Sequence, residues 1–265
     1  MTAMTSFTTA LSTEFLKLRR NKITWVTLAF YAIGPLAAAL FMVIIKNPEF
    51  ARRAGLINQK AHLIVSTADW PSFLSLILEM AVMFGIILIG VIISYVFGRE
   101  YTEQTAKNML ALPVRREWFV CGKLIVTAVW FAALVAIVLI EAVIVGFILG
   151  LPGYDHGLLV TTIGNIVATS ALALLLSPVF GWIAIATKGY LAPIGATMLA
   201  LILANVFAQT GWGKWFPWSI LGLFLGATGP RSESLSKGSY VVLAAVFLIG
   251  VLGTMVHMTR ADNTQ

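Results

Sequence analysis

The sequence predicts an all-α integral membrane protein with six transmembrane helices, on two observations. The chain of 265 residues is 59% hydrophobic and only 11% charged, with a mean hydropathy of +0.92, whereas about a quarter of the residues in a soluble domain are charged. The apolar residues also form runs of about 20, the helix length that crosses a hydrocarbon core of roughly 30 Å. Such long runs fit helices better than the short alternating strands of a membrane barrel.

Six apolar runs are long enough to cross a bilayer, and they make residues 1–265 a single membrane domain. They are Thr24–Ile45, Pro71–Phe97, Leu124–Gly150, Val160–Ala186, Leu191–Gln209 and Tyr240–Met258. The third and fourth runs exceed what a perpendicular helix needs, so we expect them to tilt. Pro178 is expected to kink the fourth run because it lacks a backbone N–H.

Residues 1–23 predict an amphipathic helix on the membrane surface. Its apolar residues recur at helical spacing on one face, and they are Phe7, Leu11, Phe15 and Leu18. Lys17 and Arg20 fall on the opposite face, where they would meet anionic headgroups. A frayed basic tail is the alternative. The apolar run that follows is too long for the core of a signal peptide, so we interpret it as a retained first span.

The net charge of +7 is interpreted as membrane topology rather than as a nucleic-acid-binding surface. With the N-terminus inside, Lys and Arg are more frequent in the inner segments, and several of the outer ones lie in the long first loop. The charge distribution therefore predicts that both termini are cytoplasmic.

The sequence offers little chemistry of its own. It has no G-x-x-x-x-G-K-[ST] phosphate loop, so nucleotide hydrolysis by this chain is not expected. His62, His156 and His257 are scattered, and Cys121 is the single cysteine, so neither a metal site nor an internal disulfide is predicted. An enzyme is the less favoured class.

Two carboxylates, Glu79 and Glu141, fall inside the second and third apolar runs. Because these runs cross in opposite directions, both carboxylates are expected in the outer half of the membrane. An unpaired charge is costly there, so each should face a cavity, a partner or another helix. They could belong to a translocation path or simply hold helices together. Asn165 and Asn205 allow the same two interpretations, with helix packing favoured.

Residues 210–239, after the fifth run, are aromatic and then apolar, but too short and Gly-broken to cross the membrane comfortably. We interpret them as a re-entrant or interfacial segment on the outer face, with its tryptophans at headgroup level. Trp215, Pro217 and Trp218 are candidates for an outer gate; ordinary membrane anchors are the alternative.

Residues 99–123, between the second and third runs, form a charged cytoplasmic segment. Arg99 to Leu112 are good helix formers and Pro113 ends the pattern, so the sequence predicts a short helix here. Tyr101, Thr105, Met109 and Leu112 share one side of that helix, and Glu103 could pair with Lys107 on the other. A loop that merely fixes orientation is the alternative.

This layout resembles the permease subunit of an ABC-2 type exporter. In that family an acidic residue at the end of the second span is followed by Glu-x-Gly-Thr, leucines, Pro and Arg, and then by Lys at the next span. The corresponding residues here are Glu100, Glu103, Thr105, Leu110, Pro113, Arg115 and Lys123. Gln104 replaces the usual Gly, and Val114 the usual small polar residue. The size of the chain resembles the bacitracin and lantibiotic self-protection branch.

The resemblance implies a multi-pass protein of the bacterial cytoplasmic membrane that works with a second permease copy or paralogue. ATP and Mg would be bound by a separate ATPase subunit, and this chain would need no cofactor. The implied ATPase-coupling residues are Glu100, Tyr101, Glu103, Thr105, Met109, Leu112, Pro113 and Arg115. The implied path or gate residues are Glu79, Glu141, Trp215, Pro217 and Trp218. The substrate would be amphipathic, such as an antimicrobial peptide.

Two other functions fit the residues. One is an ATP-independent channel or carrier that uses Glu79 and Glu141 for ion coupling. The other is a membrane scaffold without transport.

Overall fold

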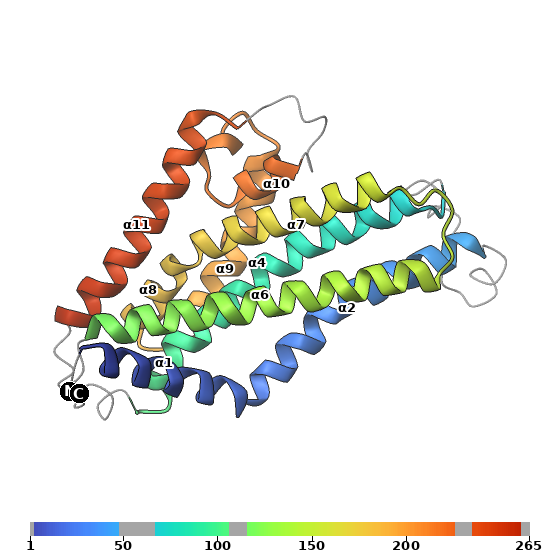
Figure 1. Ribbon diagram of the computed structural model, residues 1–265. Helices are drawn as coiled ribbons and strands as arrows, with labels where there is room; N and C mark the ends of the chain where they lie inside the picture. Colours follow the sequence, from blue (N-terminus) through green and yellow to red (C-terminus); the bar gives the residue numbers. More distant parts are fainter. Residues whose placement is uncertain (1–2, 48–66, 106–115, 226–234, 261–265) are drawn as a thin grey trace.

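The computed structural model describes residues 3–47, 67–105, 116–225 and 235–260, which are helical apart from short turns (Figure 1). The helices are α1 (Ala3–Arg19), α2 (Lys22–Lys46), α4 (Trp70–Thr102), α6 (Arg116–Ile148), α7 (His156–Leu176), α8 (Pro178–Ala186), α9 (Leu191–Ala208), the 3₁₀ turn η2 (Gly213–Trp215), α10 (Ser219–Leu225) and α11 (Lys237–Arg260).

Six of the described helical segments are long and apolar enough to cross a membrane, as the sequence predicts. They are α2, α4, α6, the α7–α8 pair, α9 and α11. The fourth span breaks where the proline was expected to kink it, because α7 ends at Leu176 and α8 starts at Pro178.

The central helix of the bundle is α4, which contacts α2, α6, α7, α8 and α9. Its buried face carries large apolar side chains, among them Phe73, Ile92 and Phe97, which are almost fully inaccessible. In Figure 1, α6 and α7 run alongside α4, while α11 leans against α8 and diverges from α6 toward its own N-terminus. The core therefore follows α4 along most of its length.

Two helices extend beyond the spans predicted from hydropathy. The second predicted span ends at Phe97, but α4 continues to Thr102; the third is predicted to begin at Leu124, but α6 begins at Arg116. Charged residues interrupt the apolar pattern at both places. They do not interrupt the helices, because several of these charges are paired inside the protein.

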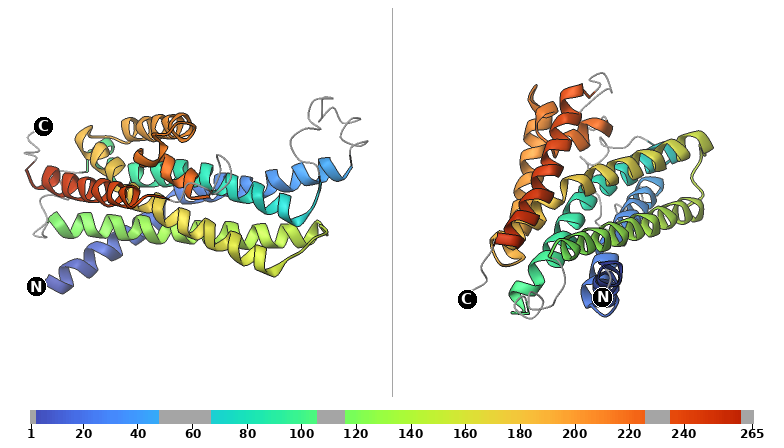
Figure 2. Two further views of the ribbon diagram at one scale, coloured as in Figure 1. Left: turned by 90° about the horizontal axis from the view of Figure 1, so that it is seen from above. Right: turned by 60° about the vertical axis from the view of Figure 1, so that its left-hand side comes forward.

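α1 and the C-terminal end of α11 lie at one end of the bundle, which we call the α1 end (Figures 1 and 2). Here Arg116, at the start of α6, donates hydrogen bonds from Nη1 to the carbonyl oxygens of Met258 and Thr259, at 3.0 and 3.1 Å. These carbonyls belong to the last turn of α11, where a cation is favourable. The side of the membrane that the α1 end faces stays a prediction.

Two glycines permit close helix packing. A Cβ atom at Gly98 would lie 2.7 Å from the backbone of Gly189, so the α8–α9 turn packs directly on the end of α4. A Cβ at Gly250 would lie 2.6 Å from the backbone nitrogen of Val179, where α11 crosses the start of α8. Any larger residue at either place would force two backbones apart.

The segment after α9 folds back on the bundle. η2 and α10 pack against α9, and α10 also contacts α7. Ile220 and Leu221 are fully buried, and Trp218 packs on Phe180 of α8 with ring centroids 5.5 Å apart. The segment is thus part of the folded core in its described residues. Its depth in a membrane stays a prediction.

Candidate functional site: the α1 end and an open cavity

The turn after α4 interrupts the helix predicted from Arg99 to Leu112 at residues 103–105, and residues 106–112 lie outside the described part of the chain. The backbone N–H of Thr105 donates to the carbonyl of Glu100 at 2.9 Å, and that of Gln104 donates to Tyr101 at 3.2 Å. This bond pair ends a helix with one residue in the left-handed conformation, and Gln104 has φ +56°. Gly adopts this conformation most easily, which explains why the resembling family has Gly where this chain has Gln104.

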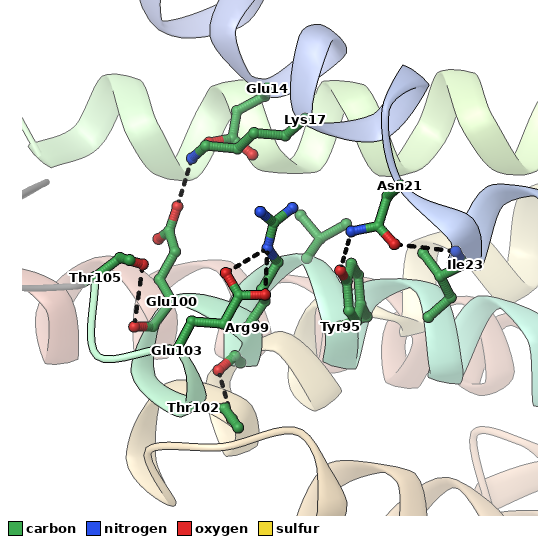
Figure 3. Close-up of polar contacts among 12 residues, drawn as sticks. Glu14, Lys17, Asn21, Ile23, Tyr95, Arg99, Glu100, Thr102, Glu103 and Thr105 are labelled. Carbon is green, nitrogen blue, oxygen red and sulfur yellow. Dashed lines mark hydrogen bonds and ion pairs between the residues drawn. The ribbon is translucent and has the colours of Figure 1, made fainter.

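The side chain of Glu103 takes a different partner from the one predicted. Its carboxylate accepts from Nε of Arg99 at 3.0 Å, one turn back on α4 (Figure 3). The expected partner, Lys107, lies outside the described residues. The Arg99–Glu103 pair is exposed, so it adds only about 0.5 kcal/mol to helix stability.

Four charged side chains form a closed ring at the α1 end, which we call the charge ring. Its members are Glu14 and Lys17 of α1, Glu100 of α4 and Lys123 of α6. The Lys17 ammonium lies 2.6 Å from Glu14 and 2.7 Å from Glu100 (Figure 3). Lys123 lies 3.1 Å from Glu100 and 3.6 Å from Glu14. Each cation therefore bridges both carboxylates, and the ring as a whole is neutral.

Burial makes the charge ring energetically important. Glu14, Glu100 and Lys123 are 6%, 5% and 3% exposed, and Lys123 also donates to the carbonyl of Val96 at 2.8 Å. Burial by itself would lower the pKa of Lys17, but the carboxylates of Glu100 and Glu14 outweigh it and raise that pKa above its ordinary value. Lys17 is therefore fully charged at neutral pH.

The charge ring corrects the expected orientation of α1. Lys17 was expected on a basic face toward lipid headgroups, but its ammonium points into the protein. Arg20 remains exposed, as expected. A second contact ties the corner between α1 and α2 to α4: Asn21 donates to the hydroxyl of Tyr95 and accepts the N–H of Ile23 at the start of α2 (Figure 3). The first helix is thus anchored to the protein at two places.

The predicted coupling residues differ in accessibility. Glu100 is enclosed by the charge ring and Tyr101 is half-buried, whereas Glu103 and Thr105 are exposed. The remaining members lie outside the described residues, and they are Met109, Leu112, Pro113 and Arg115. Docking to an ATPase stays a prediction, but Glu100 is too enclosed to contact another protein directly; its side chain holds α1, α4 and α6 together.

A cavity of about 540 Å³ opens between α4, α9 and the α10 segment, away from the charge ring. Its polar side chains are those of Ser75, Glu79, Asn205, Gln209 and Ser219, and Trp218 also lines it. The rest of the lining is mainly aliphatic, with residues Leu78, Val82, Met83, Ile86, Leu201, Ala204, Ala208 and Leu225. The cavity could therefore accommodate a drug-sized amphipathic molecule.

The structure separates the predicted path residues. Glu79 and Trp218 share this cavity. Glu141, half-buried on α6, does not line it. Trp215 lies against Gly238 at the start of α11 and is half-exposed, and Pro217 is absent from the cavity lining. A role for these three in a path or gate stays a prediction.

The sequence analysis did not identify Glu14, and it did not predict that Lys123 would be buried between two carboxylates. Glu14 lies on the same face of α1 as the apolar residues Leu11 and Leu18. An acidic residue on an otherwise apolar helix face is a signal for a buried partner. The basic partner could have been sought at Lys123, the other charge in an apolar context.

In its described residues the chain is a bundle with six membrane-length apolar helices, an open cavity and a charged end, an arrangement that suits a multi-span membrane protein. The description "ABC-2 family transporter protein" belongs to the family whose sequence profile matches residues 10–205, so this chain is a member of the ABC-2 transporter family. It is 28% identical over 186 residues to the bacitracin transport permease protein BCRB of Bacillus licheniformis, over 70% of this chain and 88% of that protein. The chain is therefore a transporter permease of the bacitracin-like branch. Residues 10–205, which match the family profile, include all four residues of the charge ring.

Proposed function

We propose that this chain is the membrane subunit of an ABC exporter that moves an amphipathic substrate, such as an antimicrobial peptide, with ATP hydrolysed by a separate ATPase subunit. Membership in the ABC-2 family and similarity to a bacitracin transport permease support the proposal. The absence of a phosphate loop from the sequence also fits an external source of energy. A second copy or paralogue would complete the membrane domain in the bacterial cytoplasmic membrane.

The observation that carries the proposal is the charge ring, which joins α4 and α6, the helices that flank residues 103–115 in the sequence, to α1. A force applied to the segment by an ATPase would reach three helices at once, because packed helices move as rigid bodies. The segment is thus suited to receive motion from a partner and pass it to the spans.

Docking can be tested with charged substitutions in the segment. We expect Met109→Asp and Leu112→Asp to prevent co-purification of the full-length chain with its ATPase, while the chain still inserts into the membrane. The reason is that burying an unpaired carboxylate in an apolar contact is unfavourable. Met109→Leu and Leu112→Met keep an apolar side chain of similar size and should retain the complex.

The alternatives predict different outcomes. Normal complex assembly in both Asp variants would refute the docking assignment. Substrate transport by the chain alone in vesicles without ATP would favour the ATP-independent carrier. An intact complex that moves no substrate would favour the scaffold.

A further inference from the structure

Glu79 places a carboxylate in the wall of the cavity. Among the described residues, it makes no hydrogen bond or ion pair, although its side chain is accessible from the cavity. Within the described lining, its neighbours include no Lys, Arg or His. The cavity therefore presents a carboxylate that the described part of the chain does not pair with a cation.

Other polar groups of the lining supply oxygen acceptors beside Glu79. Asn205 donates one amide N–H to the carbonyl of Leu201 at 3.0 Å, which leaves its side-chain oxygen for a ligand. Ser75 donates its hydroxyl to the carbonyl of Ser72 at 2.8 Å, so its oxygen is also available as an acceptor. The side-chain amide of Gln209 can both accept and donate. A ligand bound here would thus meet one carboxylate and several neutral polar groups beside an apolar wall.

The position of Glu79 along α4 favours access from water. Glu79 and Glu100 lie on the same helix, roughly 30 Å apart at 1.5 Å per residue. This separation equals the approximate thickness of a hydrocarbon core. If the charge ring marks one edge of the core, Glu79 lies close to the other edge, where water and a cationic ligand can reach it.

The geometry points to a binding site for an amphipathic organic cation, with Glu79 as the residue that recognises a primary ammonium or guanidinium group. Trp218 and the aliphatic residues of α4 and α9 would hold the apolar body of the ligand. Opposite charge and the single unpaired carboxylate select this ligand over a neutral or anionic amphipath. Binding of this ligand does not depend on the proposed function. Its transport as a substrate does rest on the proposed function.

Binding can be measured on the purified full-length chain in nanodiscs of uncharged lipid, without an ATPase. The probe is dansylcadaverine, which carries a primary ammonium on an apolar fluorescent body; its N-acetyl derivative is the matched neutral probe. We expect saturable binding of the cationic probe to the wild-type chain. Glu79→Gln should weaken it about tenfold or more, the usual effect of losing one charge-assisted contact. The neutral probe should bind weakly and equally to both proteins.

Two further variants control for folding and for location. Glu79→Asp keeps the carboxylate and should retain most of the affinity. Asp155→Asn removes an exposed carboxylate outside the cavity while keeping an N-cap residue on α7, and it should bind like the wild type. Equal affinity of wild type and Glu79→Gln for the cationic probe, or equal loss in Asp155→Asn, would overturn the inference. Neither result would bear on the proposed docking to an ATPase, because the Met109 and Leu112 variants test docking in a separate experiment.

Discussion

Replacing Lys123 by Met should destabilise the protein more than any surface substitution, because it removes one cation from a buried neutral ring. Lys123 is 3% exposed and contacts Glu100 at 3.1 Å and Glu14 at 3.6 Å. Without it, Lys17 alone faces two enclosed carboxylates, and the ring carries a net negative charge. Met has a similar length and fills the same space, so the loss reports on charge rather than on volume.

The size of the effect follows from the burial of the remaining groups. Breaking a buried ion pair by removing one partner costs about 3–5 kcal/mol. The loss of the bond to the Val96 carbonyl at 2.8 Å is part of this cost. In a chain of this size, the melting temperature should fall on the order of 10 °C.

The assay is thermal unfolding of the purified full-length chain in detergent, followed by the loss of its monodisperse size-exclusion peak. Glu100→Gln combined with Lys123→Met should be less destabilised than Lys123→Met alone, because the double variant leaves a balanced Glu14–Lys17 pair at 2.6 Å. A Lys123→Met protein as stable as the wild type would refute the assigned role of the ring. If the stability loss of the double variant equalled the sum of the losses of the two single variants, the coupling of Glu100 and Lys123 would be refuted.

Three further predictions concern the backbone and the pH response. Gln104→Gly should stabilise the protein by about 1 kcal/mol in chemical unfolding, since φ is +56° there, while Gln104→Ala should bring no such gain. Gly250→Ala should destabilise by about 1–3 kcal/mol because the new Cβ would lie 2.6 Å from the nitrogen of Val179; Gly164→Ala, with no atom within 4 Å, should not. The raised pKa of Lys17 adds stability that is complete below pH 10.5 and is lost at higher pH. The stability difference between wild type and Lys17→Met should therefore stay constant near neutrality and shrink only above that pH.

The membrane class, the number of spans and the break at Pro178 could be predicted because they depend on local properties. A run of apolar residues reports directly on the environment that a helix needs. Pro178 acts through its own missing N–H. Neither feature requires knowledge of which helices are neighbours in space.

The charge ring and the ends of α4 and α6 could not be predicted in this way. Hydropathy treats Glu100 and Lys123 as boundaries, because an isolated charge does not enter an apolar environment. Their pairing depends on the approach of α1 to α4 and α6, which is a tertiary property. The same holds for Glu79 and Glu141, which look equivalent in the sequence although only Glu79 lines the cavity between α4, α9 and α10.

The proposed function requires that this permease depend on a separate ATPase. It is tested most directly by purifying the tagged full-length chain from its native membranes and identifying the co-purifying proteins by mass spectrometry. We expect a phosphate-loop ATPase in stoichiometric amount, and ATP-dependent movement of an amphipathic substrate when the two are reconstituted together. An intact, folded chain that purifies without any ATPase and still transports substrate in its absence would contradict the account.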